Sequence, residues 1–541
     1  MSHQTSAIVF NNIKLPFDAS VQEAFSVAMR KLRSLGLTAS NSKPYVYKRS
    51  IDARNNKNIQ FVYSIAINCY NSGISADELS KHGAVAINNE KTVFNIGETP
   101  ISAPPVIVGS GPAGMYAGLI LAEMGYAPII IERGSCVKDR TDAVNRFNVT
   151  HTLDKDTNIQ FGAGGAGTFS DGKLVTRTND PLSSYVLQRL VEFGAQEEIK
   201  YIAKPHVGTD VLAKVVDNIL RRITELGGSV LYNTKMIDFE TENGSVKTVI
   251  TDKGRINAGA LILAIGHSAR DTYKTLIKKN LSIECKDFSV GMRIEHLADD
   301  IDKSLYGNFA GHPLLGHAEY NLSHNTKVRG VYTFCMCPGG EVVAATSEEL
   351  GTVVNGMSYS KRDGLNSNCA VVCSVFKDDY GATPEKAIEF QRKIERQAFI
   401  AGGGDYKAPI ITVGDFLSDK CKCDPTIITP SYMNGTNVSL ASPKDYLPGF
   451  VVDSIRSAIS AFDGKIHGFA RKEAILTGAE TRTSAPIRIL RNNDTKLALG
   501  YKNLYPAGEG AGYAGGITSA AIDGLKCAIA LMSEYKPLIR R

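Results

Sequence analysis

Three glycine-rich runs in this chain have the residue types and spacing that bring a protein backbone close to phosphate groups. The first is VIVGSGPAGMYAGLILAEMG (106–125), the second NIQFGAGGAGTFSDGKL (158–174) and the third NLYPAGEGAGYAGGITSAAIDGLKCAIA (503–530). Each contains the literal pattern G-x-G-x-x-G, which surrounds a pyrophosphate with backbone N–H groups when it joins a strand to a helix. The elements around each run decide how many dinucleotides the chain binds.

The first run has every element that a dinucleotide-binding unit requires. An apolar strand precedes Gly109, an apolar helix follows, and a second strand ends at Glu132. Gly109 permits a tight turn, Gly111 lets the backbone approach the pyrophosphate, and Gly114 lets the helix pack closely on the strand. Glu132 is placed to accept hydrogen bonds from ribose hydroxyls. The pattern predicts a dinucleotide site, and by itself it does not distinguish FAD from NAD.

The other two runs lack a complete βαβ context. The middle run has no strand before it and no long helix after it, so we interpret it as a loop whose amides approach a ligand. After Gly515 only 26 residues remain, enough for one helix but not for a returning strand. We predict a strand (LYPAG), a turn carrying Glu509, and a helix that opens at 514–518 toward an electron-poor ring carbonyl; the alternative is a plain glycine-rich helix hairpin. The first and third runs are therefore predicted to hold opposite ends of one cofactor.

Composition places the chain among ordinary globular proteins of two to four domains, with 541 residues, 43% hydrophobic and 21% charged. No apolar run approaches the roughly 20 residues that span a bilayer, so we expect no membrane partner. The N-terminal residues lack the features of a secretory signal, and ten scattered cysteines suit a reducing compartment. These features favour a cytoplasmic protein.

Residues 1–98 are predicted to form a separate α+β domain. Strand and helix patterns alternate in the order β-α-β-β-α-β, which is ferredoxin-like, and Ser20 with Glu23 forms a capping-box pair. The segment carries 11 Lys+Arg and 7 Asp+Glu, which is +4 of the total charge of +6. A turn-rich linker at 97–105 separates it from the glycine-rich part of the chain.

Several further runs carry a resemblance to a known family. GSGPAG, ALILAIGHSARDT and LYPAGEGAGYAGGITSAAIDGL resemble FAD enzymes of the glutathione-reductase-like superfamily. KRSIDAR, GGAGTFSDGKL, VGMRIEH, FCMCPGG, NGMSYSKRDG and ETRTSAPIRI resemble, more closely, its FAD-dependent dehydrogenase group, also called NAD(FAD)-utilising dehydrogenases. The resemblance covers nearly the whole chain. It implies an FAD-dependent oxidoreductase with a small-molecule substrate, and it names neither the substrate nor the catalytic residues.

The resemblance also implies an architecture and a set of cofactor contacts. The fold class is α/β, with a Rossmann-like FAD-binding domain (104–280 and 481–541) interrupted by a mixed α+β substrate cap (281–480), after the N-terminal ferredoxin-like α+β domain (1–98). Many related flavoproteins have Asp where this chain has Glu509. The residues expected to contact FAD are Gly109, Gly111, Ala113, Gly114, Glu132, Gly164, Gly165, Gly167, Thr168, Ser170, Met236, Ala264, Gly266, Gly508, Glu509, Gly515, Gly516 and Ile517.

For the electron donor, the substrate-binding residues and the acid–base groups, the sequence leaves alternatives open. Without a second complete βαβ fingerprint, either NAD(P)H docks transiently over the flavin or the electrons come from another donor. Arg482 and Arg488 either bind an anionic substrate or form structural ion pairs. His267 and His296 are possible acid–base groups, although isolated histidines are more often structural.

The cysteines allow two further hypotheses. In FCMCPGG, Cys335 and Cys337 would share one face of a strand, with Cα atoms near the limit for a relaxed disulfide, so they are either a redox pair or ordinary thiols. Cys421 and Cys423 could complete a four-thiolate zinc site with them, but C-x-C spacing is unusual for zinc, and we assign no metal site.

An alternative function comes from the basic N-terminal domain. It could make the protein a flavin-dependent RNA-modifying or RNA-binding protein, although IQFVYSI lacks the glycines of an RNP1 motif and the charge is mild. The residues that would serve this role are Tyr45, Tyr47, Lys48, Arg49, Arg54, Lys57 and Phe61.

Overall fold

The computed structural model describes residues 5–40, 43–70, 74–88, 94–175, 180–326 and 329–538. The chain divides into two compact units. Unit 1 comprises Met1–Val93, Gln196–Pro205 and Asp302–Ala318, and unit 2 comprises Phe94–Ala195, His206–Ile301 and Glu319–Arg541. Two short segments that the sequence boundaries assign to the flavin-binding and cap domains thus belong to unit 1.

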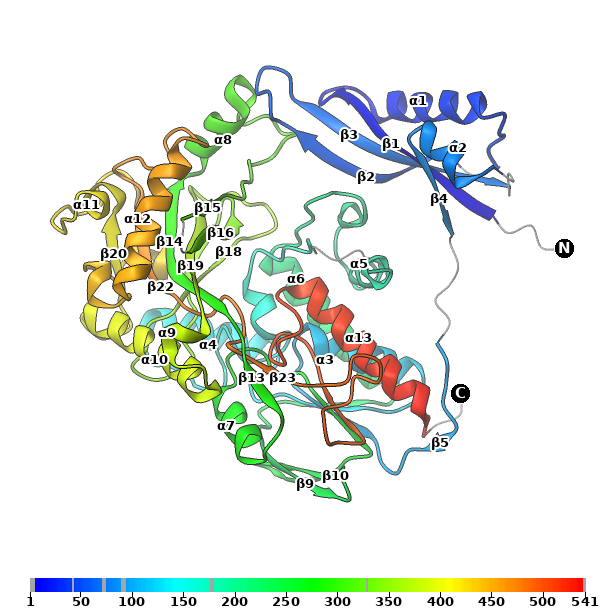
Figure 1. Cartoon of the computed structure of the whole chain (residues 1–541), viewed down its shortest axis with the longest axis vertical. Helices are drawn as coiled ribbons and strands as arrows, with labels where there is room; N and C mark the ends of the chain where they lie inside the picture. The colour runs from blue at the N-terminus through cyan, green and yellow to red at the C-terminus, as the bar shows by residue number, and fades with distance from the viewer. Residues whose placement is uncertain are drawn as a thin grey trace. The chain divides into compact units, whose positions relative to one another are not determined.

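Unit 1 contains an antiparallel four-stranded sheet in the order β2-β3-β1-β4, visible at the blue end of the chain in Figure 1. Its helix α1 begins with the expected capping box, in which Ser20 accepts from Gln22 N and Glu23 accepts from Ser20 N, both at 3.2 Å. The elements are β1 (Thr5–Pro16), α1 (Val21–Ser34), β2 (Tyr45–Asp52), β3 (Gln60–Tyr70), α2 (Ala76–Lys81), β4 (Ala84–Asn88), η2 (Glu197–Lys200) and η3 (Gly307–Phe309).

Unit 2 is built around a parallel five-stranded sheet in the order β24-β12-β6-β7-β8. β24 comes from the end of the chain and pairs with β12, so the third glycine run completes the sheet that the first run begins. The elements of this sheet and its helices are β6 (Pro105–Val108), α3 (Pro112–Glu123), β7 (Ile129–Ile131), α6 (Thr209–Glu225), β8 (Ser229–Leu231), β12 (Ala260–Leu263), β24 (Leu504–Pro506) and α13 (Ile517–Glu534).

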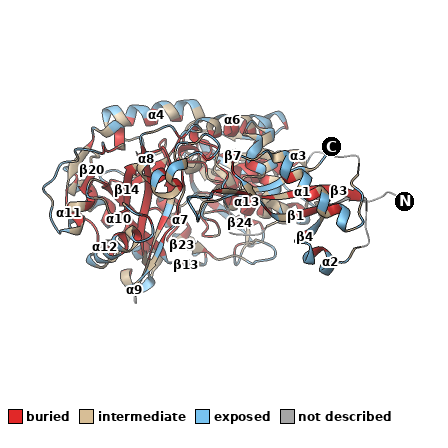
Figure 2. Cartoon of the chain, turned by 90° about the horizontal axis from the view of Figure 1, so that it is seen from above, coloured by how far each residue is buried: buried red, intermediate tan, exposed pale blue. Residues whose placement is uncertain are grey.

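The region 283–480 forms mainly a second, seven-stranded sheet in the order β15-β16-β19-β14-β22-β20-β21. β14 lies at its centre and is buried along nearly its whole length, as its red colour shows in Figure 2. The strands are β14 (Phe288–Leu297), β15 (Ser323–Asn325), β16 (Gly330–Cys337), β19 (Asn366–Val375), β20 (Ala408–Thr412), β21 (Val438–Leu440) and β22 (Ile475–Glu480). Helices α10 (Pro384–Ala401) and α12 (Gly449–Asp463) pack against it.

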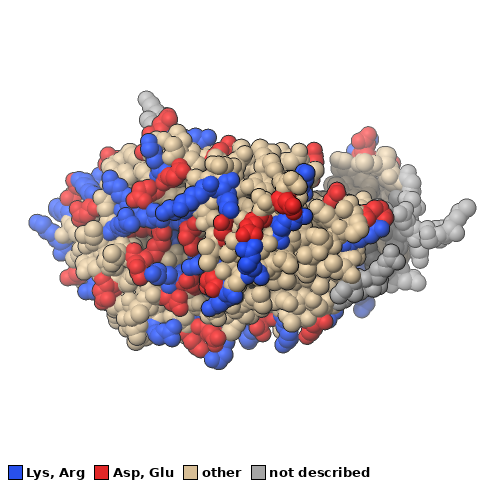
Figure 3. Space-filling model, turned by 90° about the horizontal axis from the view of Figure 1, so that it is seen from below, with Lys and Arg blue, Asp and Glu red and all other residues tan. Residues whose placement is uncertain are grey.

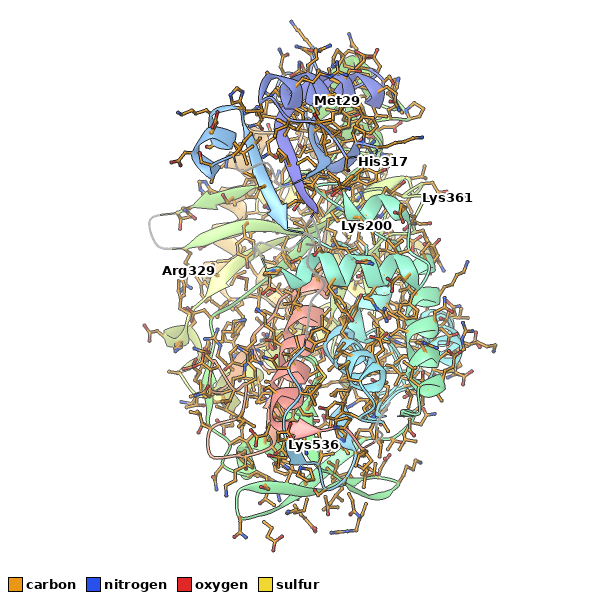
Figure 4. All side chains as sticks on the ribbon, turned by 90° about the vertical axis from the view of Figure 1, so that its right-hand side faces the viewer. Met29, Lys200, His317, Arg329, Lys361 and Lys536 are labelled. Carbon is orange, nitrogen blue, oxygen red and sulfur yellow. The ribbon has the colours of Figure 1, made fainter. Side chains whose placement is uncertain are left out.

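The remaining described strands pair into one three-stranded and three two-stranded sheets. The remaining strands are β5 (Thr99–Pro100), β9 (Met236–Glu242), β10 (Ser245–Thr251), β11 (Gly254–Asn257), β13 (Ile283–Cys285), β17 (Glu341–Ala344), β18 (Val354–Met357), β23 (Ile487–Ile489) and β25 (Tyr535–Lys536), where Figure 4 labels Lys536. The remaining helices are α4 (Val137–Thr150), η1 (Gly165–Phe169), α5 (Leu182–Glu192), α7 (Arg270–Lys278), α8 (Ala298–Tyr306), α9 (Lys377–Tyr380), α11 (Val413–Leu417), η4 (Tyr432–Gly435) and η5 (Pro443–Asp445). None of the described helices is both long and apolar enough to cross a bilayer.

Candidate functional site

The first glycine run forms the turn between β6 and α3, and its glycines have different steric roles. Gly109 has φ +99°, in the region that favours glycine, and a Cβ there would lie 2.4 Å from the Ala264 carbonyl oxygen. A Cβ on Gly114 would lie 1.9 Å from the Gly109 carbonyl oxygen. At Gly111 the nearest atom would be the Gly165 Cα, at 3.8 Å. Gly109 and Gly114 are therefore required by packing, whereas a Cβ at Gly111 would make only an ordinary contact.

Glu132 lies just after β7, where the sequence predicts it, and its side chain is buried among protein donors. One carboxylate oxygen accepts from the N–H and hydroxyl of Ser110 at 2.9 and 2.8 Å. The other accepts from the N–H groups of Gly134 and Gly162, both at 3.0 Å. A carboxylate has about four acceptor positions, so Glu132 ties the first two glycine runs together, and a ribose hydroxyl would have to share or replace one of these donors.

The second glycine run packs directly on the first. Gly164 N donates to the Ser110 carbonyl at 3.1 Å, and a Cβ on Gly165 would lie 3.0 Å from the Gly111 Cα. The loop ends in η1, where Thr168 donates to the Ala163 carbonyl at 3.2 Å. Ser170 donates to the Gly167 carbonyl at 2.7 Å. The run has no flanking strand or long helix, as its sequence predicts. It is a loop that packs beside the β6–α3 turn.

Arg140, on α4, is a residue that sequence reasoning missed. It is fully buried, and its guanidinium donates to four carbonyl oxygens of the 158–163 segment, at 2.6–3.3 Å. Burial lowers its pKa to about 10. Arg140 therefore fixes the shape of the second glycine run. Because its partners are backbone carbonyls, no residue-type pattern in the sequence points to them.

The third glycine run packs against α3 at Ala113. A Cβ on Gly508 would lie 2.7 Å from the Ala113 Cβ, and one on Gly524 would lie 2.0 Å from the Ala113 carbonyl oxygen, so α13 packs closely along α3. A Cβ on Gly167 would lie 3.1 Å from the Ile517 side chain. The three runs therefore meet at the N-terminal ends of α3 and α13.

The start of α13 is open, as the first turn of α3 is. Cβ atoms added to Gly515 and Gly516 would meet no atom within 4 Å. The N-caps of both helices are glycines, Gly111 and Gly516, and neither supplies a capping side chain. The first amides of each helix therefore depend on another partner. Two uncapped helix N-termini beside side-chain-free backbone fit the pyrophosphate and the electron-poor ring of FAD.

The remaining predicted contacts lie around these three runs. Ala264 N donates to the Val108 carbonyl at 2.9 Å, which places β12 next to the first turn. A Cβ on Gly510 would lie 2.4 Å from the Gly266 carbonyl oxygen, so β12 and the third run also meet. Met236 begins β9, two residues after Thr234, whose N–H donates to the Glu132 carbonyl at 2.8 Å.

A chain of polar side chains crosses the site from the second run to the third. Ser268 donates to Gln160 Oε1 at 3.0 Å and contacts His267 Nδ1 at 2.9 Å, and His267 Nε2 lies 3.9 Å from Glu509 Oε1. The two ring nitrogens of His267 therefore face different partners, Nδ1 the Ser268 hydroxyl and Nε2 the Glu509 carboxyl group. The sequence placed His267 and Glu509 among its candidates, but it gave no sign that they face each other.

Burial shifts the pKa values of Glu509 and His267 away from their ordinary values. It raises the pKa of Glu509 to about 7, against an opposing effect of Lys286. Burial, with the charges of Arg482 and Arg270, lowers the pKa of His267 to about 3. Near neutral pH the site therefore holds a neutral imidazole beside a carboxyl group that exchanges its proton, an arrangement suited to acid–base work.

Replacing Glu509 by Gln should remove a pH-dependent loss of stability. The folded pKa of about 7 exceeds the ordinary carboxyl value of 4.5, so the unfolded chain releases this proton first and folding becomes less favourable as pH rises between them. We expect the stability of the wild-type protein relative to Glu509→Gln to fall from pH 4.5 to 7 and to stay constant above 7. Urea unfolding of both apoproteins at several pH values measures this, and parallel curves would contradict it.

Other sequence candidates have structural partners. Arg482 is buried and pairs with Glu395 at 3.0 Å, so the structure favours the ion-pair alternative over binding of a substrate anion. Arg488 is partly exposed and lies 3.6 Å from Glu284. His296 is fully buried and its Nε2 contacts the Phe469 carbonyl at 2.8 Å, which indicates a structural role.

The four-thiolate hypothesis finds no support in the structure. Across the described residues, no three His, Cys, Asp or Glu side chains are grouped so that they could hold a metal ion. Cys421 and Cys423 therefore do not join Cys335 and Cys337. Asp415 instead accepts from the backbone N–H of Cys423 at 2.8 Å.

Within unit 1, some of the residues that would bind RNA are buried or paired with other side chains. Phe61 is 4% exposed, and the Arg49 guanidinium lies over its ring. Arg54 pairs with Asp52 at 2.6 Å, whereas Tyr45 and Tyr47 remain exposed. The face drawn in Figure 3 carries Lys and Arg interspersed with Asp and Glu. No observation favours a nucleic-acid partner.

Comparison with known proteins gives one extensive relative and one family match. An uncharacterized protein of Clostridium beijerinckii is 43% identical over 544 residues, which cover 98% of this chain and 99% of the relative. Residues 287–483 match the model of a family described as FAD-dependent protein, C-terminal domain-like.

Solved structures give weaker similarities. L-amino acid deaminase from Proteus vulgaris is 13% identical with a TM-score of 0.34, covering 83% of this chain and 97% of that one. Glycine oxidase from Geobacillus kaustophilus is 12% identical with a TM-score of 0.34, covering 81% and 94%. At such TM-scores neither a detailed fold nor a reaction carries over.

Proposed function

This chain belongs to one family with its uncharacterized Clostridium beijerinckii relative. We propose, from the FAD-dependent family model that matches residues 287–483, that it is an FAD-dependent oxidoreductase acting on a small molecule. The observation that carries the proposal is the meeting of three glycine runs at two uncapped helix N-termini. Glycines that packing does not require, Gly111, Gly515 and Gly516, surround this place. Backbone without side chains is what a bound dinucleotide needs.

Different residues of the site would bind different parts of FAD. The amides of Ala113 and Gly114 would meet the pyrophosphate, with Gly164, Gly165 and Gly167 on the opposite side. Glu132 and the backbone at Met236 would contact the adenosine half. The first amides of α13, beginning at Ile517, would face the flavin ring. Bound FAD would supply two-electron redox chemistry, while His267 and Glu509 would hold or release a proton beside it.

The domain assignment follows from this proposal. Residues 104–280 and 481–541 would form the FAD-binding domain, consistent with β24 completing the sheet of β6 and β12. Residues 281–480, which contain all seven strands of the second sheet, would form the substrate cap. The N-terminal domain (1–98) has the strand order β2-β3-β1-β4 of a ferredoxin-like fold. We further propose a cytoplasmic location and a transiently bound NAD(P)H as electron donor.

Two measurements on the purified full-length protein test the proposal. The protein, as isolated or after addition of FAD, should show flavin absorbance, and the released cofactor should have the mass of FAD. A protein that stays colourless after FAD is supplied would refute the function. Anaerobic addition of NADH or NADPH should then bleach the flavin; an unchanged spectrum would exclude a nicotinamide donor without affecting the assignment of FAD.

A further inference from the structure

Cys335 and Cys337 lie closer together than a regular strand would place them. β16 changes register against β19 between Phe334 and Cys337, and Cys335 has φ +48°, a left-handed conformation that is uncommon outside glycine. The two Sγ atoms are 4.0 Å apart, and neither is in a disulfide. The sequence predicts two cysteines on one face of an extended strand. The structure instead has a bulge at this place, which turns the two thiols toward each other.

Two cations are anchored on this bulge. Arg293 donates to the Cys335 carbonyl at 3.1 Å and its Nη1 lies 4.0 Å from Cys337 Sγ. Lys173, at the end of the second glycine run, donates to the Met336 carbonyl. Both are held in place, Arg293 by Glu480 at 2.8 Å and Lys173 by Asp171 at 2.7 Å. Cations beside a thiol favour its thiolate, which is the form that attacks disulfides.

The two thiols differ in accessibility and in acidity. Cys335 is partly exposed, whereas Cys337 is fully buried. Contact with Cys337, with the charges of Arg293 and Lys173, lowers the pKa of the Cys335 thiol, and contact with Cys335, together with burial, raises the pKa of the Cys337 thiol. The other titratable groups around the pair are Asp171, Glu319, Tyr320, Cys369 and Glu480. A partly exposed thiolate in front of a buried thiol is the arrangement of an attacking and a resolving cysteine.

We propose that Cys335 and Cys337 form a redox-active dithiol that reduces low-molecular-weight disulfides. The Cys335 thiolate attacks one sulfur of the disulfide RS–SR; the Cys335–SR bond forms, the S–S bond breaks, and RS⁻ leaves and takes up a proton. Cys337 then loses its proton and attacks Cys335 Sγ, forming the Cys335–Cys337 disulfide and expelling the second RS⁻, which is protonated. Two electrons pass from the dithiol to the substrate, which becomes two RSH; one proton comes from Cys337 and the other from solvent, because Cys335 starts as the thiolate. This exchange requires no flavin and stands apart from the proposed FAD chemistry.

The test uses the reduced full-length protein and bis(2-hydroxyethyl) disulfide as the probe. After acid quenching and alkylation, peptide mass analysis of the wild-type protein should show a Cys335–Cys337 cross-link and two released thiols per chain. Cys337→Ser should accumulate the mixed disulfide at Cys335, and Cys335→Ser should form neither product. Cys421→Ser is the matched control, since Cys421 has similar exposure, and it should behave as the wild type does.

A second measurement needs no variant. The pKa of Cys421 is raised by burial and Asp415, so at pH 6 iodoacetamide should modify Cys335 at least about 10-fold faster than Cys421. Equal rates at the two cysteines would overturn the proposal. So would a wild-type protein in which the probe leaves both cysteines reduced, or in which the mixed disulfide at Cys335 is never resolved.

Discussion

Replacing Gly111 by Ala is expected to weaken FAD binding by about 10- to 100-fold without destabilising the apoprotein. Gly111 has φ −66° and ψ 179°, which any residue adopts, and its added Cβ would meet nothing closer than 3.8 Å. The methyl group would instead occupy the space through which the pyrophosphate approaches the first amides of α3. Losing one hydrogen bond to a charged group costs about 1.5–3 kcal/mol. FAD titration followed by fluorescence gives the affinity, and urea unfolding gives the apoprotein stability.

Two further glycine substitutions make this result specific. Gly449, at the start of α12, also has open space around an added Cβ but lies outside the three runs, so Gly449→Ala should bind FAD as the wild type does. Gly114→Ala would place a Cβ 1.9 Å from the Gly109 carbonyl oxygen and should destabilise the apoprotein itself. If Gly111→Ala and Gly449→Ala bind FAD equally well, the turn between β6 and α3 does not hold the pyrophosphate.

The parts of the site that the sequence predicts are those set by local requirements. Gly109 and Gly114 follow from the geometry of a strand–turn–helix unit, and the structure forms that unit from β6 and α3. The strand at Leu504 and the helix after it follow from the number of residues that remain, whereas the two-residue strand β25, which follows that helix and pairs with β5, is not predicted. In each case the requirement lies within one continuous stretch of the chain, so the order of residue types is enough to identify it.

The parts that the sequence does not predict depend on contacts between distant residues. Arg140 fixes the second glycine run through backbone carbonyls, which every residue type has in common. The bulge at Cys335 arises from the register of β16 on β19, and the period-2 pattern of a strand cannot show it. The joining of 196–205 and 302–318 to unit 1 is likewise decided by tertiary packing.

Replacing Glu395 by Gln is expected to destabilise unit 2 by about 3–5 kcal/mol, because it leaves buried guanidinium groups without their carboxylate. Glu395, on α10, lies 2.7 Å from Arg270 and 3.0 Å from Arg482, and all three side chains are at most 4% exposed. Arg270 keeps a contact with Glu348 at 2.6 Å, whereas Arg482 loses its closest carboxylate. Urea unfolding of the two proteins at pH 7 measures the difference.

The pH dependence of the difference in unfolding free energy between the wild type and Glu395→Gln would show that the charge of Glu395, rather than its shape, is responsible. Burial alone would raise the pKa of Glu395, but the charges of Arg270 and Arg482 hold it well below the ordinary value of 4.5. A carboxyl whose folded pKa is depressed stabilises the protein fully above the unfolded pKa and loses that contribution as pH falls toward the folded one. The advantage of the wild type over Glu395→Gln should therefore be constant above about pH 4.5 and shrink below it. The control is Glu389→Gln, on the exposed face of the same helix, which removes contacts with Arg392 and Arg396. This substitution should lower the free energy of unfolding by at most about 1 kcal/mol. An equal cost at both positions would show that Arg482 does not depend on Glu395, and Arg482 would again be a candidate for binding a substrate anion.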